Sequence, residues 1–253
     1  MIELLQEAGL LFDNGKIVFP KNVTRVKIDV GLSVNAPQSQ TWISEDPNLF
    51  VLGFEPLESN LDSIRNASSQ WPIKLSPAFI GNHIALIKTA LYSAHLDEGM
   101  LLHVTKDDPG CSSLLAPKTF DVLHSERVCV WTLNDVLDFF PFDRVPVIDH
   151  LKIDAQGADF EIIKGASRFL DKFFAITLEV DTTEYKETTN SQNDVERFMM
   201  KNGFIKAGRG VFAHLNYLVK GYRIDVETDD PTYINLNQIH LSKKRRFLLY
   251  QRG

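Results

Sequence analysis

Residues 49–56, with the sequence LFVLGFEP, form an almost wholly apolar run that ends at Glu55 and Pro56. A strand in which polar and apolar residues do not alternate is typical of a central parallel strand that is covered on both faces. Parallel neighbours must be joined by crossover connections, which are usually helices. This run therefore favours a sheet with helices on both sides.

The rest of the chain repeats this alternation of strand and helix. Apolar patterns predict further strands, and the segments between them have helical spacing or begin with helix signals. The predicted strands are 23–31, 83–93, 99–106, 126–133, the start of 146–170, 172–180 and the end of the tail 243–253. The predicted helices are 2–12, 36–47, 58–67, 133–140, the end of 146–170 and 193–204. This order predicts an open, doubly wound α/β sheet with two antiparallel elements at its end.

Acidic residues fall where the predicted parallel strands end. They are Asp29, Glu55, Asp154 and Glu179. Ligands of open α/β sheets bind beyond the carboxyl ends of the strands. Glu55 lies on the strand after Gly31, where a carboxylate can accept hydrogen bonds from a ribose. The alternatives are structural: an acid at a helix N-terminus for Glu55, a helix cap for Asp154 and a generally acidic surface for Glu179.

The loop after the first predicted strand, in KIDVGLSVNA (27–36), contains a single glycine, Gly31. A dinucleotide fingerprint needs further glycines so that the backbone can approach a pyrophosphate. Leu32, Ser33 and Val34 crowd that approach, which disfavours NAD or FAD. A nucleoside without phosphates, such as S-adenosylmethionine, is compatible with this loop.

Composition and charge set limits on the partners. The net charge of −6 over 253 residues argues against nucleic acid or an anionic membrane surface as the main partner. Two cysteines, Cys111 and Cys129, do not make a disulfide framework, so reduced thiols and a cytoplasmic setting are expected. No apolar run is long enough for a membrane span, and the first residues do not resemble a signal peptide.

Several segments together resemble the FkbM family of S-adenosylmethionine-dependent methyltransferases. The most specific is LKIDAQGADFEIIKGA (151–166), which departs from the family pattern at Asp159, where Glu is usual. CSSLLAP (111–117) and TLNDVL (132–137) are also similar to family segments. The resemblance covers about residues 25–205 and implies a class I methyltransferase fold, Rossmann-like, with a mostly parallel seven-stranded sheet and an antiparallel C-terminal strand. Residues 1–24 are then an N-terminal extension and residues 25–253 a single methyltransferase domain.

The resemblance also implies a cofactor, S-adenosylmethionine, and residues that hold it. Asp29 and Gly31 match the motif at the methionine end, Glu55 with Pro56 the ribose site, and Ala90 and Leu91 the adenine region. The family usually reads D-V-G-A-N-x-G, whereas this chain has Leu32, Ser33 and Asn35 at three of these positions. We include all three in the predicted cofactor loop and expect Asn35 to supply its left-handed turn, because Asn tolerates that conformation.

Methyl transfer to a hydroxyl needs a base or a metal ion. Asp154 is the best candidate for the base and Glu179 the second candidate. We assign no metal ligands, although the same carboxylates leave a divalent cation open as an alternative. Lys152, inside a strand, is expected to pair with an acid across the sheet rather than to act in catalysis.

The resemblance favours a small-molecule or carbohydrate hydroxyl as the acceptor. Two other classes stay open at this point: a non-catalytic Rossmann-like binding protein with a degenerate cofactor loop, and a nucleotide-dependent oxidoreductase. The sequence does not decide the oligomeric state.

Overall fold

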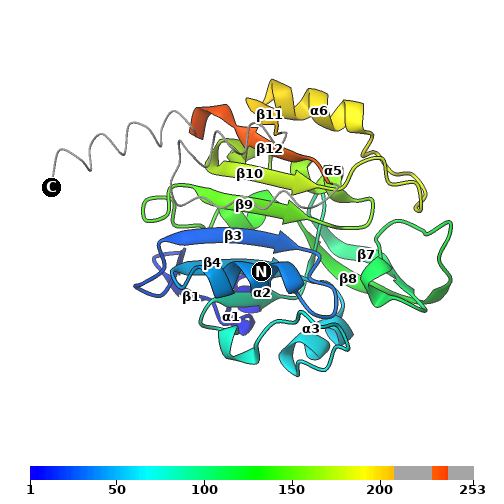
Figure 1. The fold of residues 1–253 in the computed structure, drawn as a ribbon, viewed down its shortest axis with the longest axis horizontal. Helices are drawn as coiled ribbons and strands as arrows, with labels where there is room; N and C mark the ends of the chain where they lie inside the picture. Colours follow the sequence, from blue (N-terminus) through cyan, green and yellow to red (C-terminus); the bar gives the residue numbers. More distant parts are fainter. Residues whose placement is uncertain (208–229, 239–253) are drawn as a thin grey trace, which may run out of the picture.

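The computed structural model describes residues 1–207 and 230–238. Within these residues, seven strands form one sheet in the order β11-β12-β10-β9-β3-β4-β5 (Figure 1). Their bounds, in the same order, are Phe204–Lys206, Thr232–Asn235, Phe173–Leu178, Ile148–Ile153, Arg25–Val30, Leu49–Phe54 and Ile84–Ile87. The strands from β10 to β5 pair in parallel, whereas β12 runs antiparallel to both neighbours. The predicted mostly parallel sheet with an antiparallel C-terminal strand is therefore confirmed; the strand predicted in the tail 243–253 lies outside the described residues.

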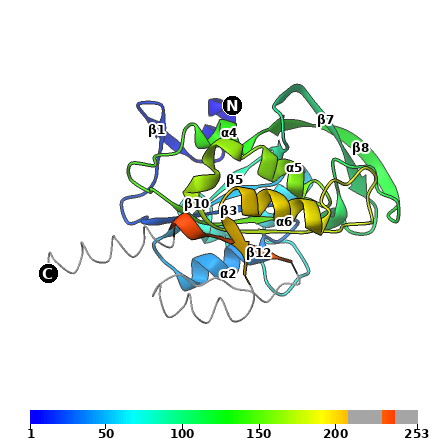
Figure 2. The ribbon, with the colours of Figure 1, turned by 90° about the horizontal axis from the view of Figure 1, so that it is seen from above.

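Helices cover both faces of this sheet. Figure 2 shows α2 on one side and α4, α5 and α6 on the other. The helices are α1 (Ile2–Glu7), α2 (Pro37–Glu45), α3 (Glu58–Arg65), α4 (Leu133–Leu137), α5 (Asp159–Lys164) and α6 (Gln192–Lys201), with short 3-10 turns η1 (Pro77–Phe79), η2 (Pro109–Cys111) and η3 (Ser167–Lys172). Every residue of β4 and of β10 is buried, as expected for strands covered on both faces.

The N-terminal segment differs from its prediction. The helix predicted over 2–12 ends at Glu7, because the chain turns at Gly9 with φ +89°. Strands β1 (Leu11–Asp13) and β2 (Lys16–Val18) then form a hairpin around Asn14 and Gly15, both of which have positive φ. Asn-Gly is the strongest short signal for such a hairpin, so this turn could have been read from the sequence.

A second sheet lies beyond the carboxyl ends of the parallel strands (Figure 1). It contains β6 (Ala90–Leu91), β8 (Val122–Trp131) and β7 (Leu96–Thr105). The strand predicted over 83–93 is wrong as one element, because β5 ends at Ile87 and β6 pairs with β8. Thr89 lies between β5 and β6. Its hydroxyl contacts the backbone oxygens of Ala90 and of Cys129 on β8, at the point where the chain passes from the first sheet to the second.

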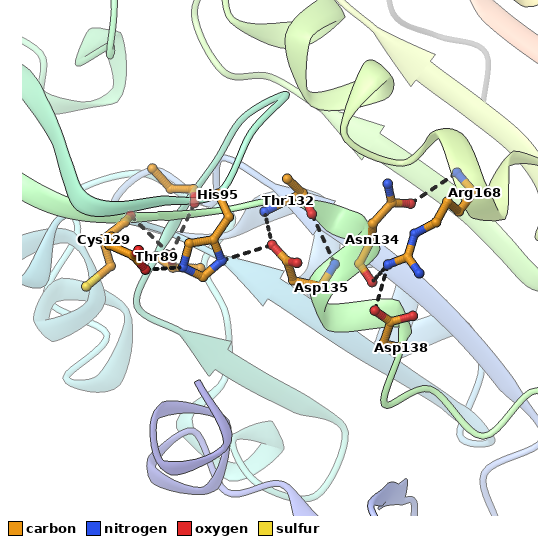
Figure 3. Close-up of polar contacts among 10 residues, drawn as sticks. Thr89, His95, Cys129, Thr132, Asn134, Asp135, Asp138 and Arg168 are labelled. Atoms are coloured by element: carbon orange, nitrogen blue, oxygen red, sulfur yellow. Dashed lines mark hydrogen bonds and ion pairs between the residues drawn. The ribbon is translucent and has the colours of Figure 1, made fainter.

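Polar contacts fix the second sheet to the main body, as Figure 3 shows. Thr132 and Asp135 form a reciprocal capping box at the start of α4. His95, from the segment just before β7, lies 3.2 Å from the same Asp135 carboxylate through its Nδ1. At the other end of α4, Arg168 bonds to Asp138 at 2.6 Å. The helix α4 thus links the hairpin of β7 and β8 to the turn that precedes β10.

Candidate active site

A cavity opens at the carboxyl ends of β3, β4, β5 and β9. The space within its lining, open solvent included, is about 630 Å³. The loop between β7 and β8 contributes one wall, through residues 109–114. The predicted residues that line the cavity are Gly31, Ser33, Glu55, Pro56, Ala90, Leu91 and Asp154.

Gly31 lies where the end of β9 passes closest to the first loop. Its φ is +80°, and a Cβ added there would lie 1.9 Å from the backbone oxygen of Asp154. Its N–H donates to the Phe54 carbonyl at 3.0 Å. A side chain at this position would overlap the Asp154 carbonyl, and the close approach brings the ends of β3, β4 and β9 together at the cavity.

The rest of the first loop turns in an unexpected way. Ser33 and Ala36 have positive φ, at 55° and 45°, whereas Asn35 does not. The prediction that Asn35 makes the left-handed turn is therefore wrong. The Asn35 side chain instead donates to the Ile73 carbonyl at 2.8 Å and holds the segment after α3. Leu32 is buried in the apolar cluster beneath α2, so neither of these two side chains lines the cavity.

Glu55 is buried and holds the first two loops together. Its Oε2 accepts the Ser33 N–H at 3.0 Å, and its Oε1 accepts the Leu57 N–H at 3.0 Å. Burial raises the pKa of Glu55 to about 7, although these bonds and the nearby Asn60 favour the charged form. A carboxylate has about four acceptor sites, so Glu55 keeps capacity for a hydroxyl donor from the cavity.

Asp29 lies beneath the cavity and does not line it. The Ser39 hydroxyl donates to Asp29 Oδ2 at 2.6 Å, and Lys152 Nζ lies 3.5 Å from Asp29 Oδ1. The predicted pairing of Lys152 with an acid across the sheet is thus confirmed. Burial raises the pKa of Asp29 above its ordinary value. Burial lowers the pKa of Lys152, but the charges of Asp154 and Asp29 outweigh this and hold it above its usual range.

Asp154 follows β9 and presents its carboxylate to the cavity. Its Oδ2 lies 3.3 Å from Lys152 Nζ, and its Oδ1 accepts from Gln156 Nε2 at 2.8 Å. Gln156 has φ 54° and Gly157 has φ 93°, so the predicted turn at these two residues has a left-handed backbone. Gln156 Oε1 in turn faces the hydroxyl of the buried Tyr185 at 2.7 Å.

Glu179 follows β10 and lies outside the cavity lining. Burial, together with the charges of Asp154, Asp230 and Glu184, raises the pKa of Glu179 to about 7. Within the described residues its Oε2 is buried and accepts no hydrogen bond. The residues of the described ranges contain no group of three or more His, Cys, Asp or Glu side chains placed to hold a metal ion, so the divalent cation gains no support.

Asp159, where the resemblance expects Glu, is fully buried at the start of α5. Its carboxylate accepts backbone N–H groups of Gly157 at 3.1 Å and of Ala155 and Glu179, both at 3.3 Å. The residue joins the turn after β9 to the end of β10. Burial raises the pKa of Asp159 to about 7, with the charges of Asp154 and Glu179 adding to the effect.

Sequence reasoning missed part of the lining. Side chains or backbone from Asn60, Thr89, Leu102, Gly110, Ser112, Ser113 and Gln156 also face the cavity. The Ser113 hydroxyl donates to the Gln156 carbonyl at 2.8 Å, and a Cβ on Gly110 would lie 2.7 Å from Ser33 Oγ. The segment CSSLLAP (111–117) enters the sequence prediction only through its resemblance to the family. No local pattern could show that a hairpin loop folds back onto two strand ends.

Comparison with known proteins agrees with this geometry. Residues 40–206, about two thirds of the chain, match the family described as the methyltransferase FkbM domain. The chain belongs to the FkbM methyltransferase family. It is therefore an enzyme that transfers methyl groups, which sets aside the non-catalytic binding protein and the oxidoreductase. The match begins at residue 40, after β3 and the loop 31–36.

Other comparisons add little. No curated protein matches the chain. A crystal structure of a 30S ribosomal A1408 methyltransferase from an uncultured bacterium is similar at 12% identity and a TM-score of 0.33, over 88% of this chain and 96% of that one. Values this low support no conclusion about the acceptor. In the ranges 1–207 and 230–238, none of the helices has the length and apolar character needed to cross a membrane.

Proposed function

We propose that this FkbM methyltransferase takes its methyl group from S-adenosylmethionine and transfers it to a hydroxyl of a small-molecule or carbohydrate acceptor. The choice of cofactor rests on Glu55, a buried residue that lines the cavity. Its carboxylate can accept further hydrogen bonds after those from two backbone N–H groups. A carboxylate at this position can accept hydrogen bonds from the hydroxyls of a ribose.

Two further features fit this cofactor. Gly31 lines the cavity at the end of β3, where the methionine part would lie. Phe54, Leu91 and Leu102 also line the cavity and are apolar residues against which a purine can pack. Asp29, Leu32 and Asn35 would act indirectly, by shaping the loop, because their side chains do not line the cavity.

An oxygen acceptor is supported by Asp154. The bound cofactor would supply a methyl group on a positively charged sulfur, which is already activated for displacement. Asp154 would take the proton of the acceptor hydroxyl as an oxygen lone pair forms the bond to the methyl carbon; the electron pair of the broken carbon–sulfur bond would stay on sulfur, and S-adenosylhomocysteine would leave. Lys152 Nζ lies 3.3 Å from Asp154 Oδ2 and places a positive charge beside this carboxylate. Glu179, outside the lining, would contribute charge rather than contact.

Methyl transfer to a panel of acceptors tests this function. The native chain would be incubated with S-adenosylmethionine and with sugars or polyols, and with amines for comparison, while formation of S-adenosylhomocysteine is measured. We expect product with hydroxyl acceptors and a loss of at least tenfold in rate in Asp154→Asn, as is usual when a general base is removed. Transfer only to amines, or an unchanged rate in Asp154→Asn, would contradict the oxygen acceptor or the base.

A further inference from the structure

The hydroxyl of Tyr185 faces two acceptors at the same distance. It lies 2.7 Å from the backbone oxygen of Cys111 and 2.7 Å from Gln156 Oε1. A phenol has one proton, so it can donate to only one of them at a time. Burial raises the pKa of Tyr185, which keeps the hydroxyl neutral. At any moment, therefore, the Tyr185 hydroxyl donates to one of these two oxygens and not to the other.

Gln156 lies between this hydroxyl and the candidate base. While Asp154 is charged it can only accept, so Gln156 must present Nε2 to it, at 2.8 Å. Gln156 Oε1 then faces Tyr185, and Tyr185 donates to it. If Asp154 gains a proton on Oδ1, its O–H becomes a donor. The amide, turned by 180°, would then present Oε1 to Asp154 and Nε2 to Tyr185, and Tyr185 would donate to Cys111.

We infer that Gln156 and Tyr185 form a two-state relay that holds Asp154 in position both before and after it accepts a proton. The inference rests on the proposed role of Asp154 as the base. The proton leaves the acceptor hydroxyl and stays on Asp154 Oδ1; along the relay only the amide and the phenol O–H reorient, and no charge moves. Gln156 and Tyr185 are thus positioning residues.

The fold gives the relay fixed ends. Tyr185 is fully buried, and its ring packs against Gly157, where a Cβ would lie 3.4 Å from Tyr185 Cδ2. The Gln156 backbone is held by the Ser113 hydroxyl. Lys152 lies beside Asp154 Oδ2, which leaves Oδ1 as the oxygen that takes a proton. Among the described residues, the other titratable groups whose charges act on this region include Asp29, Asp108, Cys111, Asp159, Glu179 and Glu184.

Nuclear magnetic resonance of the full chain without cofactor tests the relay. The chain would carry ¹³C in the Asp carboxyl groups, ¹⁵N in the Gln side chains and ¹³C at Tyr Cζ, and would be titrated from pH 8 down to the pH at which circular dichroism shows unfolding. We expect the Gln156 and Tyr185 signals to change with the same midpoint as the Asp154 carboxyl carbon. Tyr233, buried on β12, is the control tyrosine and should not follow Asp154.

Two variants separate this relay from a merely structural contact. In Gln156→Met, Tyr185 should no longer follow Asp154. In Asp154→Asn, the shared transition of Gln156 and Tyr185 should disappear; if it persists, those signals follow a neighbour such as Glu179 and the relay is overturned. Gln156 and Tyr185 signals that stay constant while Asp154 titrates, or an Asp154 that never titrates in the folded chain, would also overturn it.

This outcome is independent of the cofactor, because it is read from the free protein. Failure to bind S-adenosylhomocysteine would therefore count against the proposed function and leave the relay to be judged on its own signals. A loss of turnover in Asp154→Asn together with silent relay signals would retain the base and reject the relay.

Discussion

The backbone N–H of Ser33 donates to Glu55 Oε2 at 3.0 Å, and this bond joins the loops that follow β3 and β4. Ser33 reaches Glu55 because its backbone is left-handed, with φ 55°. The altered first loop therefore still surrounds the cavity, although it keeps only one glycine. This hydrogen bond holds the loops after β3 and β4 together at the candidate cofactor site.

Replacement of Glu55 tests its part in cofactor binding. Hydrogen bonds to a charged group contribute about 1.5–3 kcal/mol, so we expect Glu55→Gln to weaken S-adenosylhomocysteine by about 10- to 100-fold at pH 8. Glu58→Gln, three residues along and on the exposed surface of α3, is the matched control. Equal affinity in the native chain and Glu55→Gln, both folded by circular dichroism, would remove Glu55 from the site.

The pH dependence of binding follows from the same carboxylate. Burial raises the pKa of Glu55 to about 7, so below that pH the group is mostly protonated and accepts fewer bonds. Because ribose hydroxyls favour the ionised form, affinity should fall by about tenfold from pH 8 to pH 6. Calorimetry with S-adenosylhomocysteine at several pH values measures this. In Glu55→Gln this part of the pH dependence should vanish.

Gly31 offers a test of the close approach between β3 and β9. Ala at a left-handed position costs about 1–2 kcal/mol, and we expect only that cost in Gly81→Ala, where φ is +79° and no atom lies within 4 Å of the added Cβ. Gly31→Ala should cost more, because its Cβ would overlap the Asp154 carbonyl. Denaturant unfolding of both variants gives the comparison; equal losses would show that the overlap is relieved without cost.

Lys152 should stabilise the fold through the charges around it. Its loss leaves the buried Asp29 without its counter-charge, so Lys152→Met should lower the free energy of unfolding by about 3–5 kcal/mol. Lys88→Met is the control, because Lys88 pairs with Glu58 on the surface and such pairs contribute at most about 1 kcal/mol. Similar losses in the two variants, measured by denaturant unfolding at pH 7, would contradict this role.

Two strands of the central sheet could be predicted closely from the sequence, because β4 and β10 are apolar runs. The predicted strands over 49–56 and 172–180 match β4 and β10 to within two residues at each end. The acids at their ends followed from the same pattern. The resemblance at residues 151–166 then predicted the family, which the match over residues 40–206 confirms.

Contacts between distant segments could not be predicted. β12 is four residues long and carries no strong pattern of its own, since its burial comes from insertion between β10 and β11. The propensity of Asn for a left-handed backbone predicts the turn at Asn35, but the side-chain amide of Asn35 instead donates a hydrogen bond to the Ile73 carbonyl. The hydrogen bond between Gln156 and Tyr185 joins residues 29 positions apart in the sequence. Hydrophobic periodicity predicts local elements and gives no information about such a contact. The hydroxyl acceptor and the cytoplasmic setting stay predictions.

The most direct test is a calorimetric titration of the native chain with S-adenosylhomocysteine at pH 8, with NAD as the comparison. We expect one molecule bound per chain, displacement by S-adenosylmethionine and no heat with NAD. No heat with either adenosyl compound, or binding of NAD alone, would contradict it.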